Sequence, residues 1–399
     1  MLNWPADRSG ILWGRGSVRA WEVGALAPCG SETLGRELEK GTLGEVWVRF
    51  PRLLGDVIFS LPFFGSLQRA WNPVAAAAGV QLRWIAVGHA LGAALFSEAD
   101  PGYVAESLTE SGGQGKPDPR SLQRRWRANR PVAVVNLSQS VRLALGAWLA
   151  RVPIRAGDVN NHLGFLYHHR FTYRDLPVPI VERYRPLLVK LTGQDALCWE
   201  PITPQRFGGL GGPRKLRDLG WAGEPYVTLG FGTRGDPKRW FPEEEKWPAL
   251  GRLLQERGLA VVWLGGPDER DQGSGLAAAV PGSFNLTGQT TIPEACALQH
   301  GAAGNIAVDT GLVHTAAATG RPTVMLNSCS PEPLINPLGP LALSVRGPLL
   351  DLDDRPAPGG QPGCSAHRIP PERVLNLLLA LMAEVRQPQV AALPAFASR

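Results

Sequence analysis

The sequence has few cysteines, and they form no metal-binding pattern. Five occur in 399 residues, at Cys29, Cys198, Cys296, Cys329 and Cys364, an odd number without a Cys-x-x-Cys pair. This spacing argues against a disulfide framework or a zinc cluster and favours a reducing cytoplasm.

Long apolar runs are also missing. No window approaches the ~20 consecutive apolar residues that a membrane-spanning helix needs. The opening MLNWPADRSG lacks the basic segment followed by an apolar one that marks a signal peptide. We therefore expect a soluble, cytoplasmic protein, with any membrane contact peripheral.

The composition is that of a globular chain with many turns. Hydrophobic residues make up 44% and charged residues 19%, and there are 47 glycines and 36 prolines. The formal net charge of +6 and a pI near 9.3 favour an acidic partner, such as a phosphorylated ligand or an anionic membrane surface.

Short apolar strands alternate with helical patterns in two separate stretches, which predicts an α/β protein. The first has strands at 44–50, 82–88 and 131–138, and the second contains PYVTLGFG, LAVVWLGG, NIAVDT and PTVMLNS. Such alternation is typical of doubly wound parallel sheets. We expect two Rossmann-like lobes facing each other across a cleft. The expected parts are an irregular extension (1–43), an N-terminal lobe (44–196), a linker (197–224), a C-terminal lobe (225–369), and a final helix and tail (370–399). Within the first lobe, residues 106–130 read as a polar surface loop or insertion.

Ligands of open parallel sheets bind beyond the carboxyl ends of the strands, where this chain carries several polar residues. Asp56 follows a strand in LLGDV and suits either a general base or a helix N-cap. In GFGTRGDPKRW, Thr233 and Lys238 suit phosphate oxygens, although basic glycine-rich turns are common. Glu269 in LGGPDE suits ribose hydroxyls or is a solvated surface glutamate.

The segment NIAVDTGLVHTAAATG is the most informative. Asp309 ends a strand, and Thr310 and Gly311 open a helix whose N-terminal amides suit a diphosphate. His314 lies one turn further on, and a lone helical histidine is also a common core or surface residue. The acidic run DLDD (351–354) lies in a Pro/Gly-rich segment and reads as a solvated turn rather than a metal site.

Together these motifs resemble glycosyltransferase family 9, the ADP-heptose:lipopolysaccharide heptosyltransferases. The similar segments occur in the family's order and cover roughly residues 44–385: VRFPRLLGDVIFSLP, NLSQSVRLALGAWLARVPIRAG, GTRGDPKRWFPEEEKW, VVWLGGPDE, NLTGQTTIPEACAL and VDTGLVHTAAATGRPTV. The resemblance implies a GT-B fold and an inverting, metal-independent transfer without a cofactor. Its donor substrate would be ADP-heptose, bound by the C-terminal lobe. The N-terminal lobe would bind the acceptor, the lipid A–Kdo-type inner core of lipopolysaccharide. The opening motif is closer to the second-heptose enzymes.

The resemblance also implies residue roles. Asp56 looks like the catalytic base, and Asp309 looks like a contact to the transferred sugar. The other expected donor contacts are to phosphate or diphosphate (Thr233, Lys238, Thr310 and Gly311, with His314 beside them) and to ribose (Glu269).

A basic stretch in the first lobe departs from the family's usual length, as does the N-terminal extension. It contains Lys116, Arg120, Arg124, Arg125, Arg127 and Arg130, interrupted by Trp126. It suits docking on an anionic bilayer, at the cytoplasmic face of the inner membrane, or on phosphorylated lipid A. The alternative is a solvated, flexible loop.

Two other functions fit the same motifs. One is a GT-B transferase with a different nucleotide sugar or acceptor, and the other is a non-catalytic nucleotide-sugar-binding protein. A role with nucleic acid is not expected, because the sequence offers no recognition helix or basic strand with interleaved aromatics.

Overall fold

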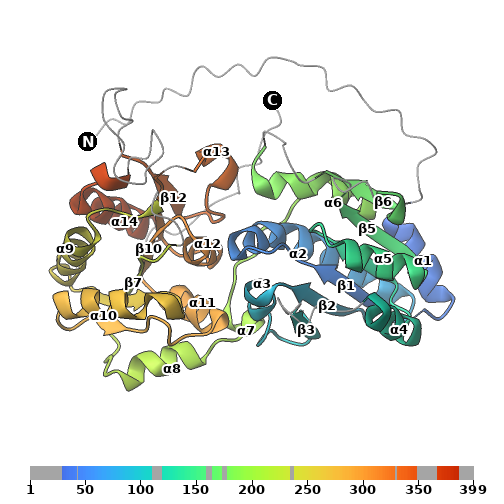
Figure 1. Ribbon diagram of the computed structural model, residues 1–399, viewed down its shortest axis with the longest axis horizontal. Coiled ribbons are helices and arrows are strands. Elements are labelled where there is room, and N and C mark those ends of the chain that lie inside the picture. The colour runs from blue at the N-terminus through green and yellow to red at the C-terminus, as the bar shows by residue number, and fades with distance from the viewer. Residues whose placement is uncertain are drawn as a thin grey trace, which may run out of the picture.

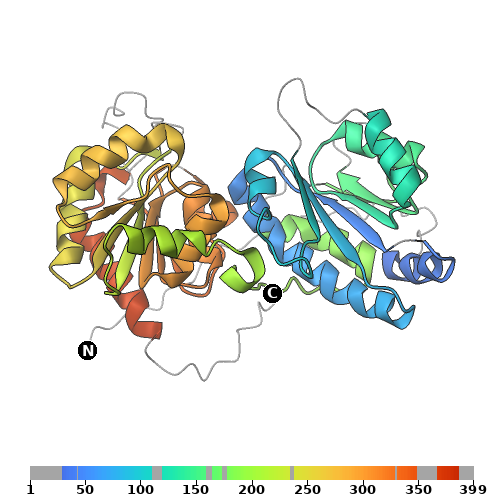
Figure 2. The same cartoon turned by 90° about the horizontal axis from the view of Figure 1, so that it is seen from below.

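The computed structural model describes residues 29–42, 44–109, 119–158, 164–172, 178–233, 238–328, 330–347 and 366–385. These residues form two lobes side by side, each a parallel sheet covered by helices (Figure 1, Figure 2). This confirms the predicted α/β class with two doubly wound sheets.

The two sheets have the same topology. The first contains β1 (Glu45–Arg49), β2 (Arg83–Gly88), β3 (Glu106–Thr109), β4 (Ala133–Asn136), β5 (Ile154–Asp158) and β6 (His169–Phe171), in the order β3-β2-β1-β4-β5-β6. The second contains β7 (Tyr226–Gly230), β8 (Ala260–Leu264), β9 (Phe284–Asn285), β10 (Gly304–Val308), β11 (Thr323–Leu326) and β12 (Ala342–Val345), in the order β12-β11-β10-β7-β8-β9. In each sheet the strand order reverses next to the first strand, between β1 and β4 and between β7 and β10. Those two points are where this fold binds ligands.

The helices cover both faces of each sheet. Those of the first lobe are α1 (Gly30–Glu39), α2 (Leu54–Ala77), α3 (Ala90–Ala94), α4 (Pro119–Asn129), α5 (Val141–Leu149) and α6 (Arg185–Thr192). Between the sheets lie α7 (Pro204–Phe207) and α8 (Gly211–Asp218), followed by α9 (Glu243–Gln255), α10 (Arg270–Ala279), α11 (Ile292–Gly301), α12 (Gly311–Ala318), α13 (Glu332–Ile335) and α14 (Pro371–Val385). Short 3₁₀ helices complete the described part: η1 (Gly164–Leu166), η2 (Ile180–Tyr184), η4 (Pro267–Glu269) and η5 (Ala366–Arg368).

The strand sequences explain why the sheets are buried on both faces. In β1, Val46 and Val48 pack with α2 and α6, whereas Trp47 between them packs on the other face with α4 and α5. Strand β7 is buried throughout. Continuous apolar strands of this kind are typical of parallel sheets covered by helices on both sides.

The prediction of a surface loop over residues 106–130 is wrong where the structure describes it. This part of the chain forms β3 and α4, and residues 110–118, including Lys116, lie outside the described residues. Trp126 is only 1% exposed and packs edge-on against Trp47, with 5.4 Å between the ring centroids. Arg125 lies over the same Trp47 ring and pairs with Glu106. One buried indole therefore anchors a helix whose sequence is otherwise polar.

Helices also occur in two segments for which the sequence predicted an irregular extension and a linker. Helix α1 lies within 1–43 and buries Leu34 and Leu38 in the core of the first lobe, because its apolar positions repeat every four residues. Helices α7 and α8 lie within 197–224, and Leu216 of α8 packs in the C-terminal lobe.

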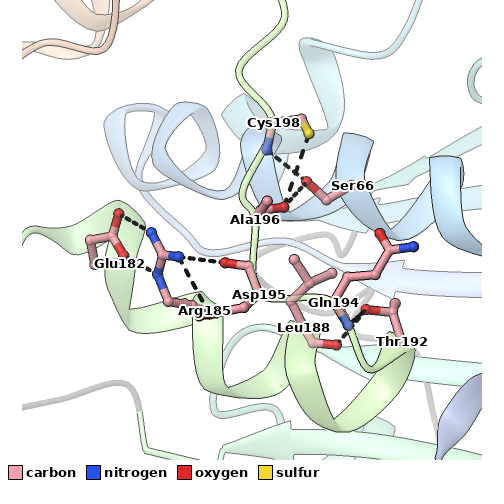
Figure 3. A network of polar contacts seen from close by, with 9 residues as sticks. All are labelled: Ser66, Glu182, Arg185, Leu188, Thr192, Gln194, Asp195, Ala196 and Cys198. Atoms are coloured by element: carbon pink, nitrogen blue, oxygen red, sulfur yellow. Dashed lines mark hydrogen bonds and ion pairs between the residues drawn. The ribbon is translucent and has the colours of Figure 1, made fainter. Parts of the chain in front are cut away.

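The chain leaves the first lobe along a path fixed by polar contacts (Figure 3). Arg185 of α6 bonds Glu182 and the carbonyl of Asp195. Ser66 of α2 accepts a hydrogen bond from the amide of Cys198 at 2.8 Å and donates one to the carbonyl of Ala196 at 3.3 Å. These contacts hold the start of the connection against α2 and α6.

Candidate functional site

The two lobes meet at the N-termini of α2 and α12, one from each ligand-binding edge. A Cβ atom on Gly55 would lie 2.9 Å from Cδ2 of His314, and a Cβ atom on Gly311 would lie 3.0 Å from Cβ of Leu54. The ring of Phe59 packs against His314, with 4.8 Å between the centroids. Glycine at these two positions therefore lets the helix ends approach closely across the lobes.

Asp56 lies in the first turn of α2, directly after Gly55, and its side chain is partly exposed. Its chain neighbour Gly55 is the residue that lies against His314 of the other lobe. The N-cap of α2 is Leu53, so Asp56 is not the N-cap residue that the sequence left open.

Asp309 is the polar centre of the second lobe's edge. It follows β10, is 4% exposed, and accepts hydrogen bonds from Lys238 Nζ at 2.7 Å and from the hydroxyl of Ser330. Nε2 of His314 lies 3.5 Å from its other oxygen. Burial alone would raise the pKa of Asp309, but the contacts to His314, Lys238 and Ser330 outweigh burial and hold that pKa well below its usual range. Asp309 is therefore ionised and orients Lys238 and His314.

The N-terminus of α12 presents polar atoms without partners. The hydroxyl of Thr310, its N-cap residue, and Nδ1 of His314 are both buried and have no hydrogen-bond partner among the described residues. Buried polar groups are normally paired, so this arrangement fits a ligand that supplies the missing contacts. An anion suits the site, because the helix N-terminus adds unpaired amides and the positive end of its dipole.

Glu269 belongs to the same edge. Its Oε2 accepts a hydrogen bond from the amide of Gly266 at 2.7 Å, and a side chain at Gly232 would overlap its carboxyl group. Thr233 follows Gly232 at the end of β7, and residues 234–237 lie outside the described residues. The seven residues predicted as donor contacts thus all follow the carboxyl ends of β7, β8 and β10.

Two features of these edges are not predicted from the sequence. Ser330 follows β11 and bonds both Asp309 and Arg346. Its position after a predicted strand was a usable signal, because all strand ends of a parallel sheet meet at one edge.

In the first lobe, a polar cluster at the ends of β4 and β5 was also missed. Gln139 donates to the buried Asp158 at 3.2 Å, and Asn136 donates to the hydroxyl of Tyr167 at 2.7 Å. Burial raises the pKa of Tyr167 to about 12, so this phenol stays protonated at neutral pH. The cluster lies at the same edge as Asp56, since β4 pairs directly with β1.

Within the described ranges, no group of three or more His, Cys, Asp or Glu side chains is arranged to hold a metal ion. The DLDD run lies outside those ranges. Nor is any helix of the described chain long and apolar enough to cross a bilayer.

Two Rossmann-like lobes whose ligand-binding edges face each other define the architecture of a GT-B glycosyltransferase. The profile of glycosyltransferase family 9 (heptosyltransferase) matches residues 120–353. The chain belongs to this family.

Individual proteins that are similar to this chain are heptosyltransferases as well. The chain is 29% identical over 217 residues to lipopolysaccharide heptosyltransferase 3 of Escherichia coli, covering 50% of this chain and 60% of that one. It is 32% identical over 194 residues to lipopolysaccharide heptosyltransferase 1 of Pseudomonas aeruginosa, covering 46% and 51%. The matched part thus spans little more than half the length of these curated relatives. The solved structure of E. coli ADP-heptose LPS heptosyltransferase II has the same fold, with a TM-score of 0.68 and 24% identity, over 86% of this chain and 100% of that one.

Proposed function

We propose that this protein transfers a heptose from ADP-heptose to the lipid A–Kdo-type inner core of lipopolysaccharide. Family membership and the names of the relatives support the sugar and the acceptor. The second-heptose step suggested by the opening motif stays a prediction, since the relatives of this chain include heptosyltransferases numbered 1, 2 and 3.

The observation that carries the mechanism is the contact between the N-termini of α2 and α12. Gly55, the residue directly before Asp56, lies against His314 of the other lobe, and this contact supports a position of Asp56 near the proposed donor contacts. Asp56 removes the proton from the acceptor hydroxyl as that oxygen attacks the anomeric carbon. The bond from this carbon to the diphosphate breaks on the opposite side, so the anomeric configuration inverts without a covalent intermediate.

The departing diphosphate gains negative charge, and this chain's own groups stabilise it. Lys238 supplies a positive charge, while Thr310 and the first amides of α12 supply hydrogen-bond donors. Glu269 accepts hydrogen bonds from the ribose hydroxyls, and Asp309 contacts the transferred sugar. With this cradle the transfer needs no metal ion, so a chelator should leave the rate unchanged.

The test is Asp56→Asn, assayed by mass spectrometry with ADP-heptose and a truncated lipopolysaccharide acceptor. Loss of a general base should lower kcat by about 10²–10⁴-fold, with ADP-heptose binding unchanged. The matched control is Asp271→Asn, which removes an acidic side chain from the first turn of α10 in the other lobe. Near wild-type turnover in Asp56→Asn would remove Asp56 from the role of base.

A further inference from the structure

The outward face of α5 is apolar, which is unusual for a surface helix. Four large apolar residues on it are exposed: Val141 (42%), Leu145 (37%), Trp148 (44%) and Leu149 (36%). With the exposed Arg142 they form one stripe along the helix, which we call the α5 face. The opposite side of α5, with Leu143 and Ala147, is buried in the lobe. A helix that packs on a sheet normally turns polar residues outward, so the α5 face needs a partner.

The chain around α5 carries charge of one sign only. Residues 119–157 contain no Asp, Glu or Lys, but they contain eight arginines: Arg120, Arg124, Arg125, Arg127, Arg130, Arg142, Arg151 and Arg155. Because the whole chain has a formal charge of +6, the remaining residues sum to −2. The positive charge of the protein is thus concentrated in the segment that forms α4, β4, α5 and most of β5.

Three of these arginines line a hollow where α4 and α5 lie side by side (Figure 1). The hollow has a volume of about 440 Å³, and Arg127, Arg130 and Arg151 line it together with Leu149 of the α5 face. Arg130 and Arg151 have φ angles of 45° and 56°, in the left-handed region that residues other than glycine rarely adopt. Both costly backbone conformations occur at exposed arginines of the same hollow, which points to a functional use.

We propose that the α5 face and this hollow dock on the surface of an anionic lipid bilayer. Leu145 and Trp148 enter the boundary between headgroups and acyl chains, and the three arginines bind lipid phosphates. The charge favours a bilayer over a second copy of this chain, because a two-fold interface would bring the same arginines face to face. This docking rests on the proposed function, in which the acceptor is a lipid.

The position of α5 fits such an acceptor. The helix begins five residues after Asn136, which ends β4 and pairs in register with Arg49 of β1. The α5 face therefore starts at the sheet edge that carries Asp56 and runs away from it. The hollow lies at the other end of α5, next to the amino ends of β4 and β5, so the docked protein rests on the membrane along the length of α5, with the acceptor edge at one end of the contact.

The experiment is co-sedimentation of the full chain, without donor, with vesicles of phosphatidylcholine containing about a third phosphatidylglycerol. L145Q/W148Q removes apolar contacts. R127Q/R130N/R151N removes charge, with asparagine chosen at the two left-handed positions because it tolerates them. The charge variant should bind roughly a hundredfold more weakly, about fivefold per arginine, and the apolar variant at least about tenfold more weakly. The matched controls are R214Q/R217Q/R257N and L210Q/L219Q, which change exposed residues elsewhere by the same charge and polarity.

Three results would overturn the proposal: unchanged binding in the apolar or the charge variant, equal losses in the controls, or equal binding to pure phosphatidylcholine vesicles. So would a wild-type dimer in sedimentation velocity that L145Q/W148Q converts to a monomer, since the occupant would then be a second copy. With a vesicle-anchored acceptor, the apolar and the charge variants should both lose turnover. With the same acceptor in detergent, both should keep wild-type turnover. No turnover at all with ADP-heptose would refute the proposed function and leave the binding result intact.

Discussion

The carboxylate of Asp309 is almost completely buried, and the Lys238 ammonium group that contacts it serves two purposes. Lys238 neutralises a buried charge, and the same ammonium group lies at the end of the sheet where a diphosphate would bind. A single substitution at Lys238 therefore mixes a loss of stability with a loss of function. The two can be separated because the partner carboxylate can be neutralised as well.

We predict that Lys238→Met lowers the free energy of unfolding by about 1–3 kcal/mol, because it removes a partner from the buried Asp309. It should also lower kcat by about 10²-fold, through lost stabilisation of the leaving group. Denaturant unfolding and steady-state kinetics measure the two effects. The double variant Lys238→Met/Asp309→Asn should regain most of the stability and none of the turnover. Recovery of turnover in the double variant would mean that Lys238 acts only by neutralising Asp309.

At the scale of single elements, strand β6 contains a buried titratable group. His169 is 5% exposed, and burial, with smaller contributions from the charges of His168 and Lys190, lowers its pKa from the usual 6.5 to about 4. The folded state therefore keeps this imidazole neutral where the unfolded chain already binds a proton.

The consequence is a loss of stability in acid. The contribution of His169 to the free energy of unfolding is complete above pH 6.5. It is lost progressively as the pH falls towards 4, by roughly 2–3 kcal/mol. His169→Phe should flatten that part of the profile, measured as the free energy of unfolding at half-unit pH steps. Parallel profiles for the variant and the wild type over this interval would show that His169 does not carry the effect.

Elements with strong local patterns were predictable from the sequence, and those held by a single distant contact were not. Strands β1 and β10 contain β-branched and aromatic residues, so their ends, and with them Asp56 and Asp309, were placed correctly at the sheet edges. Helix α4 was missed because its sequence is polar and because the residue that anchors it, Trp126, packs against Trp47, which is distant in the sequence.

The outward face of α5 was missed for a different reason. Periodicity alone does not distinguish a helix with one covered side from a helix covered all round. Only the exposed fractions of Leu145 and Trp148 reveal the difference. The contact of Gly55 with His314 likewise depends on how the lobes sit together, which no local pattern encodes.

At the scale of the whole molecule, the lobes are joined by a polar and backbone network around the connection. Glu98 accepts a hydrogen bond from the amide of Gly209 at 3.0 Å and lies 3.4 Å from the hydroxyl of Thr291. The amide of Ile202 donates to the carbonyl of Ala318, at the end of α12, at 2.8 Å. These contacts fix the approach of α2 to α12, so a small change at the helix ends alters the site without unfolding either lobe.

The substitution Gly55→Ala tests whether catalysis depends on the approach of α2 to α12. An added methyl group would lie 2.9 Å from the ring of His314, closer than side-chain carbons approach in proteins, so Gly55→Ala must move the helix ends apart. A displacement of a few tenths of an ångström between base and leaving group should lower kcat by about tenfold or more. The affinity for ADP-heptose should change little, because the expected donor contacts all belong to the other lobe.

The same helix supplies the matched control for this substitution. A Cβ atom on Gly65 would meet only the carboxyl group of Glu200, at 3.9 Å, an ordinary contact. Gly65→Ala should therefore raise the free energy of unfolding by about 0.5–1 kcal/mol through helix propensity and leave kcat unchanged. Kinetics and calorimetry on the two variants separate the effects. If Gly55→Ala keeps full turnover while Gly65→Ala behaves as expected, then catalysis does not depend on the close approach of α2 to α12. Asp56 would then not act on a ligand held by the other lobe.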